Sequence, residues 1–142
     1  MSQLSPRQIT LIQQSFDQVS PIRDKAAAIF YARLFEIAPQ VRPYFKGDMT
    51  AQGAKLMATL GAVVVGLDEL DRIVPVAQSL AVRHVDYGVQ PEDYTPVGEA
   101  LIYALAQGLG AAFTTELKES WITAYGILSA VMIDAAYPKA KQ

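Results

Sequence analysis

The sequence of 142 residues contains no cysteine and only one histidine, His84. The lack of cysteine excludes disulfides, thiolate metal ligands, iron–sulfur clusters and cofactors attached through thioether bonds. A single histidine excludes any site that needs two or more imidazoles from one chain. Few kinds of catalytic or metal site are therefore open to this sequence.

The sequence also lacks a basic cluster and a long apolar run. Its 12 basic and 14 acidic residues are spread along the chain and give a net charge of −2, so nucleic acid is not an expected partner. The longest apolar stretch, residues 61–67, is too short to cross a bilayer. The first residues have neither the positive charge nor the apolar run of a signal peptide. We therefore expect no membrane association and a cytoplasmic location.

Size and composition fit one domain. A chain of 142 residues and 15.4 kDa can bury one substantial core, and we expect a single domain over residues 1–142. Apolar residues make up 51% of the chain, and the mean hydropathy is +0.18. This surplus fits either a generous core or an apolar pocket wall, and composition does not separate the two.

Helical spacing and helix-boundary signals run along the sequence. Ser5, Pro6 and Gln8 match a capping box with proline in the first turn, and Ser20 followed by Pro21 repeats the cap-and-proline pattern. No stretch alternates convincingly with a period of two, so strands are not expected. We predict an all-α fold with roughly six to eight helices of unequal length. Apolar residues three or four positions apart mark the predicted inward faces: Ile9, Ile12, Phe16, Val19, Leu56, Leu60, Val63, Val64, Leu67, Ile73, Val76, Leu80, Val97, Leu101, Leu105, Leu117, Trp121, Tyr125 and Leu128.

His84 is the first candidate for chemistry. It lies four residues after Leu80, which puts it on the inward face of its helix. A neutral imidazole donates a hydrogen bond from one ring nitrogen and offers the other nitrogen as a ligand to a transition metal. The alternative is a core histidine bonded to a backbone carbonyl, which is the more common case for a histidine taken alone.

Four further polar residues are candidates. Tyr31 lies in a helix whose other inward residues are apolar, so its hydroxyl needs a buried partner. Gln52 lies four positions before the inward Leu56 and shares its face. Tyr94 begins a long helix, and Lys55 lies at the edge of an inward stripe. Taken singly, each of these residues also fits a structural or solvated position.

The common catalytic motifs are absent from the sequence. It contains no glycine-rich phosphate loop, no nucleophile elbow and no HExxH-type zinc site. The sequence thus offers few candidate catalytic residues to an enzyme that relied on side chains alone. The sequence therefore favours a cofactor that brings its own chemistry.

Taken together, four stretches of the sequence resemble the single-domain haemoglobins of bacteria and the globin domain of flavohaemoglobins. They are FYARLF (30–35), APQVRPYF (38–45), LAVRH (80–84) with YGV (87–89), and YTPVG (94–98) with Trp121 and YG (125–126). The stretches extend over nearly the whole chain and follow the order seen in that family. The resemblance implies a globin fold with its helices around a haem pocket.

The resemblance also implies roles for individual residues. It implies haem b (iron protoporphyrin IX), bound non-covalently, with His84 as the iron ligand. It places Tyr31 and Gln52 beside the bound gas, where they would also be the catalytic pair. The residues that it implies for the haem contacts are Phe45, Lys55, Leu56, Tyr94, Val89, Val97 and Leu101.

The resemblance implies reversible binding of O2, with NO and CO as further ligands. It also raises an NO dioxygenase activity, which would need an external reductase because residues 1–142 contain no flavin or nicotinamide domain. The alternative is O2 storage, delivery or sensing without turnover. That alternative is favoured by Ala136, which stands where the flavohaemoglobin pattern has a glutamate. A haem-free helical interaction module is a third interpretation.

Overall fold

The computed structural model describes residues 4–45, 47–86 and 90–136. These residues form α-helices and short 3-10 helices, and no strand occurs among them, which confirms the all-α prediction. The six α-helices found in these ranges are α1 (Pro6–Val19), α2 (Arg23–Ile37), α3 (Met49–Val65), α4 (Leu70–Asp86), α5 (Tyr94–Leu109) and α6 (Thr115–Ala136). The 3-10 helices are η1 (Ser20–Ile22), η2 (Pro39–Tyr44), η3 (Leu67–Glu69), η4 (Pro91–Asp93) and η5 (Gly110–Ala112).

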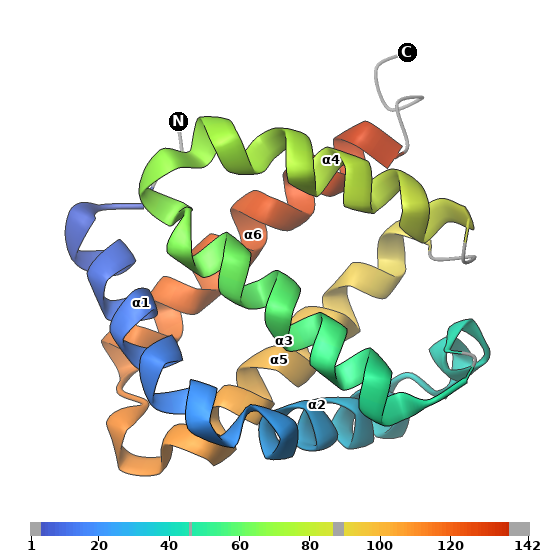
Figure 1. The fold of residues 1–142 in the computed structure, drawn as a ribbon, viewed down its shortest axis with the longest axis horizontal. Coiled ribbons are helices and arrows are strands. Elements are labelled where there is room, and N and C mark those ends of the chain that lie inside the picture. Colours follow the sequence, from blue (N-terminus) through green and yellow to red (C-terminus); the bar gives the residue numbers. More distant parts are fainter. Residues whose placement is uncertain (1–3, 46, 87–89, 137–142) are drawn as a thin grey trace.

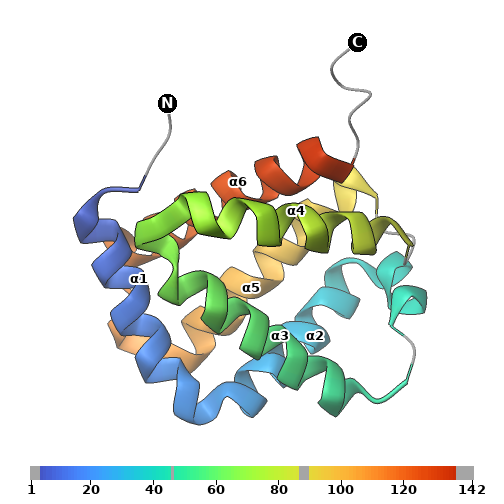
Figure 2. The same cartoon turned by 45° about the horizontal axis from the view of Figure 1, so that its top comes forward.

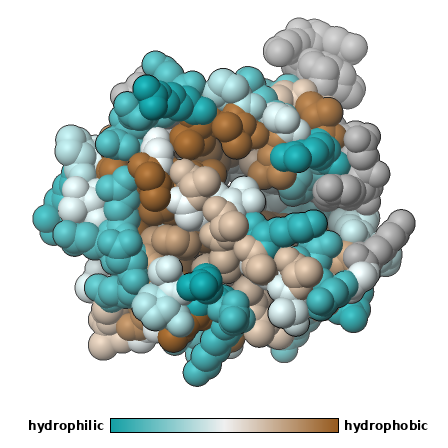
Figure 3. Space-filling model, viewed as in Figure 1, coloured by the Kyte–Doolittle hydropathy of each residue, from teal (hydrophilic) through white to brown (hydrophobic). Residues whose placement is uncertain are grey.

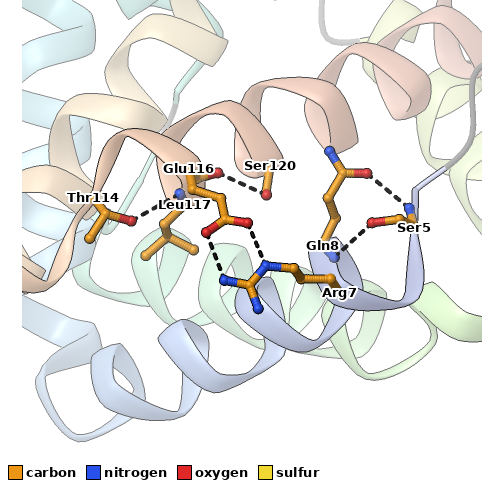
Figure 4. A network of polar contacts seen from close by, with 7 residues as sticks. All are labelled: Ser5, Arg7, Gln8, Thr114, Glu116, Leu117 and Ser120. Carbon is orange, nitrogen blue, oxygen red and sulfur yellow. Dashed lines mark hydrogen bonds and ion pairs between the residues drawn. The ribbon is translucent and has the colours of Figure 1, made fainter.

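The predicted capping box at the start of α1 is confirmed. The Ser5 hydroxyl accepts a hydrogen bond from the backbone N–H of Gln8 at 3.1 Å, and the Gln8 side chain accepts one from the Ser5 N–H at 2.8 Å. Arg7, in the first turn, donates two hydrogen bonds to the carboxylate of Glu116 in α6 (Figure 4). The polar groups at this end of the molecule therefore satisfy one another and join α1 to α6.

The helices cross one another in a globule without layers of sheet (Figure 1). The most extensive packing joins α2 to α5 and α4 to α6, and α3 also packs against α2. Two groups of buried side chains result. The α1–α6 cluster consists of Leu4, Ile12, Val19, Ala26, Ala27, Met57, Val64, Leu67, Leu105, Leu117, Trp121 and Ala124. The α2–α5 cluster consists of Phe30, Tyr31, Leu34, Ala38, Val41, Ala100 and Ala104.

The predicted helix cap at Ser20 is wrong. Helix α1 runs directly into η1, and the backbone N–H of Ser20 donates to the carbonyl of Phe16 as the C-cap of α1. Helix α2 then begins at Arg23 with Ile22 as its N-cap residue, which has no side-chain acceptor. The Ser-Pro pair therefore starts a 3-10 turn and does not cap the next α-helix.

The predicted inward position of Val76 is also wrong, because its side chain is 51% exposed. The buried face of α4 is made by Ile73, Ala77 and Ala81. Val76 lies about 100° round the helix from Ala77, as any neighbouring residue does. Apolar side chains gather over α4 on the face drawn in Figure 3.

No helix in the described part of the chain is both long enough and apolar enough to cross a membrane.

Candidate functional site

His84 lies near the end of α4 and is half-buried. Its Nδ1 atom lies 2.7 Å from the backbone carbonyl oxygen of Leu80, one turn earlier in the same helix. Because a carbonyl oxygen only accepts hydrogen bonds, the proton of the neutral ring is assigned to Nδ1 and the lone pair to Nε2. The structure therefore shows the backbone bond that the sequence left as one alternative, and this bond is compatible with a metal-ligating imidazole, which such contacts commonly orient.

Tyr31 lies in α2 and is 9% exposed. Its hydroxyl donates to the backbone carbonyl oxygen of Gln52 over a distance of 3.4 Å. Hydroxyl-to-carbonyl bonds are usually about 2.7–2.8 Å long, so this bond is weak. Burial raises the pKa of Tyr31 above its ordinary value, which keeps the phenol protonated and able to donate.

Three aromatic rings pack against Tyr31. Its ring centroid lies 5.0 Å from that of Phe30, 6.0 Å from that of Phe35 and 5.3 Å from that of Phe45. Phe35 and Phe45 also meet edge to face at 5.4 Å. These contacts fix the ring of Tyr31, so the direction of its hydroxyl is set by packing.

Gln52 lies in the first turn of α3, opposite Tyr31. Asp48 caps this helix by accepting a hydrogen bond from the Thr50 N–H at 2.9 Å. The next residue, Gly53, is buried against α2: a Cβ atom there would lie 3.0 Å from the Cβ of Ala27. Glycine therefore allows the close approach of α2 and α3 that brings Gln52 to the hydroxyl of Tyr31.

The apolar residues assigned to the haem contacts lie together. Phe45, Leu56, Val97 and Leu101 all pack against the α2–α5 cluster, and each is only partly buried. They are contributed by the segment after η2, by α3 and by α5, and they present apolar surface beside Tyr31. Lys55 is exposed on α3 and forms no ion pair with a described residue. Val89 lies outside the described residues.

Tyr94 is the first residue of α5 and is 7% exposed. Its carbonyl oxygen accepts a hydrogen bond of 2.6 Å from the hydroxyl of Tyr125 in α6. Burial raises the pKa of Tyr125 well above its ordinary range, and the neighbouring Tyr94 adds to the shift. Gly98 makes this packing possible, because a Cβ atom at that position would lie 2.6 Å from the ring of Tyr125.

The sequence did not single out Tyr44 and Asp93. Asp93 is 4% exposed, and its Oδ2 atom accepts hydrogen bonds from the Tyr44 hydroxyl at 3.0 Å and from the Gln90 N–H at 2.9 Å. The only signal was local: Asp93 follows a proline that opens a short helical turn. The hydrogen bond from Tyr44, 49 positions away, could not be predicted from any sequence pattern.

These residues fit a haem group. A histidine binds haem iron as the neutral imidazole, and the bond between His84 and Leu80 fits the tautomer with its lone pair on Nε2. The flat apolar face of the ring needs apolar surface, and the four partly buried residues beside Tyr31 offer it. A buried phenol at the same site supplies a hydrogen-bond donor.

Comparison with known proteins agrees with this fit. The chain is 28% identical to Neuroglobin of Tetraodon nigroviridis, over 93% of this chain and 92% of that protein. It is 29% identical to Flavohemoprotein of Rhodopirellula baltica and 26% identical to that of Bacillus subtilis, over 92% of this chain in both cases. The chain spans 33% of the length of each of these two flavohemoproteins. The globin family pattern matches residues 28–132, so the chain belongs to the globin family.

Proposed function

We propose that this chain binds haem b non-covalently through His84 and reversibly binds a diatomic gas beside Tyr31 and Gln52. Haem-based gas binding follows from membership of the globin family. The identity of the haem, the mode of attachment and the roles of the individual residues are the proposed part. The observation that carries them is the weak bond of 3.4 Å from the buried Tyr31 hydroxyl to Gln52.

His84 would hold the iron, and haem would supply an open coordination position for the gas. The bond from Nδ1 to the Leu80 carbonyl orients the ring and leaves the lone pair on Nε2. The bond lies within one turn of α4, so it needs no contribution from another helix. The ligand is therefore oriented in advance of haem binding.

Tyr31 would stabilise the bound gas by donating a hydrogen bond. O2 takes on negative charge when it binds ferrous iron, and hydrogen bonds to charged acceptors contribute about 1.5–3 kcal/mol. The present bond to the Gln52 carbonyl is long, so exchanging it for a better acceptor costs little. Leu56 and Phe45, at the same site, would exclude water.

We further propose that the chain converts NO to nitrate when a reductase is present. The overall reaction consumes one NO, one O2 and one electron for each nitrate formed. The electron would come from a flavin- or nicotinamide-dependent reductase. Tyr31 and Gln52 support this proposal as polar residues at the gas site.

Storage, delivery or sensing of O2 without turnover is the second candidate. Ala136, the last residue of α6, favours this second candidate. An alanine has no carboxylate that could make His84 a more electron-donating ligand of the iron. The two candidates differ in whether nitrate is formed. Nitrate formation no faster than with free haem would leave gas binding alone.

The gas-binding proposal is tested by the O2 dissociation rate of Tyr31→Phe, measured by stopped flow. Loss of the hydroxyl should speed O2 release by about one to two decades. CO, which carries less negative charge when bound, should be affected less. The matched control is Tyr103→Phe, because Tyr103 is 39% exposed on α5 and its ring lies 4.6 Å from the Arg33 guanidinium carbon. An unchanged O2 rate in Tyr31→Phe would contradict the role of Tyr31.

A further inference from the structure

Asp93 is a buried carboxylate between two segments that are far apart in the sequence. Its exposed fraction is 4%, and its Oδ2 atom accepts both the Tyr44 hydroxyl at 3.0 Å and the Gln90 N–H at 2.9 Å. A buried carboxylate is costly unless hydrogen-bond donors satisfy it. Bonds to a charged acceptor are also stronger than bonds between neutral groups. The carboxylate therefore holds its two donors firmly.

The position of this contact links it to the haem site. Tyr44 ends η2 and is followed directly by Phe45, while Asp93 ends η4 and is followed directly by Tyr94. The carbonyl of Tyr94 is in turn bonded to the Tyr125 hydroxyl at 2.6 Å. Figure 2 shows the segment after α2 close to the one that leads into α5. Two hydrogen bonds, joined through the peptide bond between Asp93 and Tyr94, thus link η2 to η4 and the start of α5 to α6, beside residues assigned to the proposed haem site.

We propose that the Tyr44–Asp93 hydrogen bond is a clasp that holds the pocket edge closed and sets the rate at which haem leaves. The inference rests on the proposed function, because it concerns retention of the same haem. Phe45 directly follows Tyr44, and Val97 lies one turn after Asp93; these residues, the two walls of the proposed site, pack against the same cluster. Separating these two walls requires η2 to move away from η4, which breaks the bond between Tyr44 and Asp93. Both are positioning residues and need no contact with the haem.

The test uses Tyr44→Phe, Asp93→Asn and the double variant. Tyr44→Phe removes only the hydroxyl, so it keeps the packing of the ring. The rate of haem transfer from the ferric protein to an excess of an acceptor apoprotein should rise about tenfold in each single variant. Asp93→Asn removes the charge of the acceptor and so weakens the bond from Tyr44. The double variant should be no faster than about the faster single variant, because both changes act on the same Tyr44–Asp93 bond. Tyr103→Phe is the control and should lose haem at the wild-type rate.

Hydrogen exchange of the haem-free proteins separates the clasp from a general loss of stability. The clasp predicts faster exchange in Tyr44→Phe confined to η2, η4 and the residues next to them. A general loss of stability would speed exchange in all helices and lower the urea midpoint. Acceleration throughout the molecule would therefore overturn the proposal.

The outcomes also distinguish the clasp from the proposed function. If the wild type binds haem and the variants lose it at the wild-type rate, the clasp is wrong and the proposed function stands. If rates in the double variant multiply, the two residues act independently, and the clasp is wrong again. A wild-type protein that binds no haem contradicts the proposed function itself.

Discussion

The hydrogen bonds of the α1–α6 cluster, at one end of the molecule, are shorter than the hydrogen bond of Tyr31 in the α2–α5 cluster, at the other end. In the α1–α6 cluster, the buried Trp121 indole donates to the Ser15 hydroxyl at 3.0 Å, and Ser15 donates to the Ile12 carbonyl at 2.8 Å. Beside the α2–α5 cluster, the Tyr31 hydroxyl reaches its acceptor only at 3.4 Å, and the neighbouring Phe45 and Leu56 are partly buried. The polar groups of the first end form hydrogen bonds of ordinary length with one another. The second end has a loosely engaged donor and apolar surface that a ligand can cover.

This contrast teaches that stability and ligand binding are supplied by different parts of one helical fold. Groups that satisfy one another contribute to the free energy of unfolding and have little left to offer a ligand. A hydrogen-bond donor that is held in place but makes only a long bond, such as the Tyr31 hydroxyl, can exchange that bond for a better one to a ligand. Substitutions in the two clusters should therefore separate the two properties.

The largest effects are expected from truncating one fully buried side chain in each cluster. Ile12 and Leu34 are both 0% exposed, so Ile12→Ala and Leu34→Ala should each lower the free energy of unfolding by about 2–5 kcal/mol. Only Leu34→Ala lies in the cluster beside the proposed haem site, so only that variant should also speed haem loss. Urea unfolding and haem transfer measure the two quantities. Equal haem-loss rates in the two variants would break the comparison.

The next effect is expected from Ser15→Ala. This change leaves the buried Trp121 N–H without its acceptor and should cost about 1–3 kcal/mol of unfolding free energy. O2 and CO kinetics should stay at wild-type values, because Ser15 belongs to the other end of the molecule. The control is Ser129→Ala, whose exposed hydroxyl only bonds the Gly126 carbonyl at 3.2 Å. A change in gas kinetics without a loss of stability would contradict this division.

A smaller effect is expected from Lys55→Ala. Lys55 is exposed on α3, and an exposed ion pair with an acidic group of the haem would contribute less than about 1 kcal/mol. The rate of haem loss should therefore rise by less than about threefold, and the difference should shrink in high salt. Lys118→Ala, an exposed lysine on α6, should have no effect. A tenfold change for Lys55→Ala would show that this residue is a principal haem contact.

The smallest effect is expected at the Arg7–Glu116 pair. The guanidinium of Arg7 lowers the pKa of Glu116 below its ordinary value of 4.5. A carboxylate with a lowered pKa stabilises the fold above its ordinary pKa, and this stabilisation is lost as the pH falls through the lowered value. The stability difference between wild type and Arg7→Met should be small at pH 7 and vanish on acidification. Urea midpoints that differ equally at pH 7 and pH 3 would contradict it.

Much of the fold could be predicted because its signals are local. The capping box of Ser5 and Gln8 depends on residues three positions apart, and the structure has both of its hydrogen bonds. The inward position of Ile12 follows from the period of one helix. The predicted inward position of Val76 was wrong because spacing alone does not say which side of an apolar stripe another helix covers. The small Ala77 and Ala81 mark the buried face of α4, and they add little to a hydrophobic pattern.

The site was predicted less completely, for a physical reason. The sequence put Tyr31 and Gln52 on inward faces, but the observed bond goes to the backbone carbonyl of Gln52, and no side-chain pattern encodes that acceptor. Asp93 and Tyr44 lie 49 positions apart and meet only because the chain folds. Long-range polar pairs of this kind depend on the arrangement of whole helices, which a single sequence does not specify.

The central claim is that His84 holds haem, and absorption spectra test it most directly. The purified protein is reconstituted with haem and examined in the ferric, ferrous and CO-bound forms, beside His84→Gly with and without added imidazole. We expect a Soret band that shifts sharply with CO in the wild type. In His84→Gly the band should be altered and haem affinity lowered by more than about a hundredfold, with recovery on adding imidazole. No Soret band in the wild type, or a wild-type spectrum in His84→Gly without imidazole, would contradict the account.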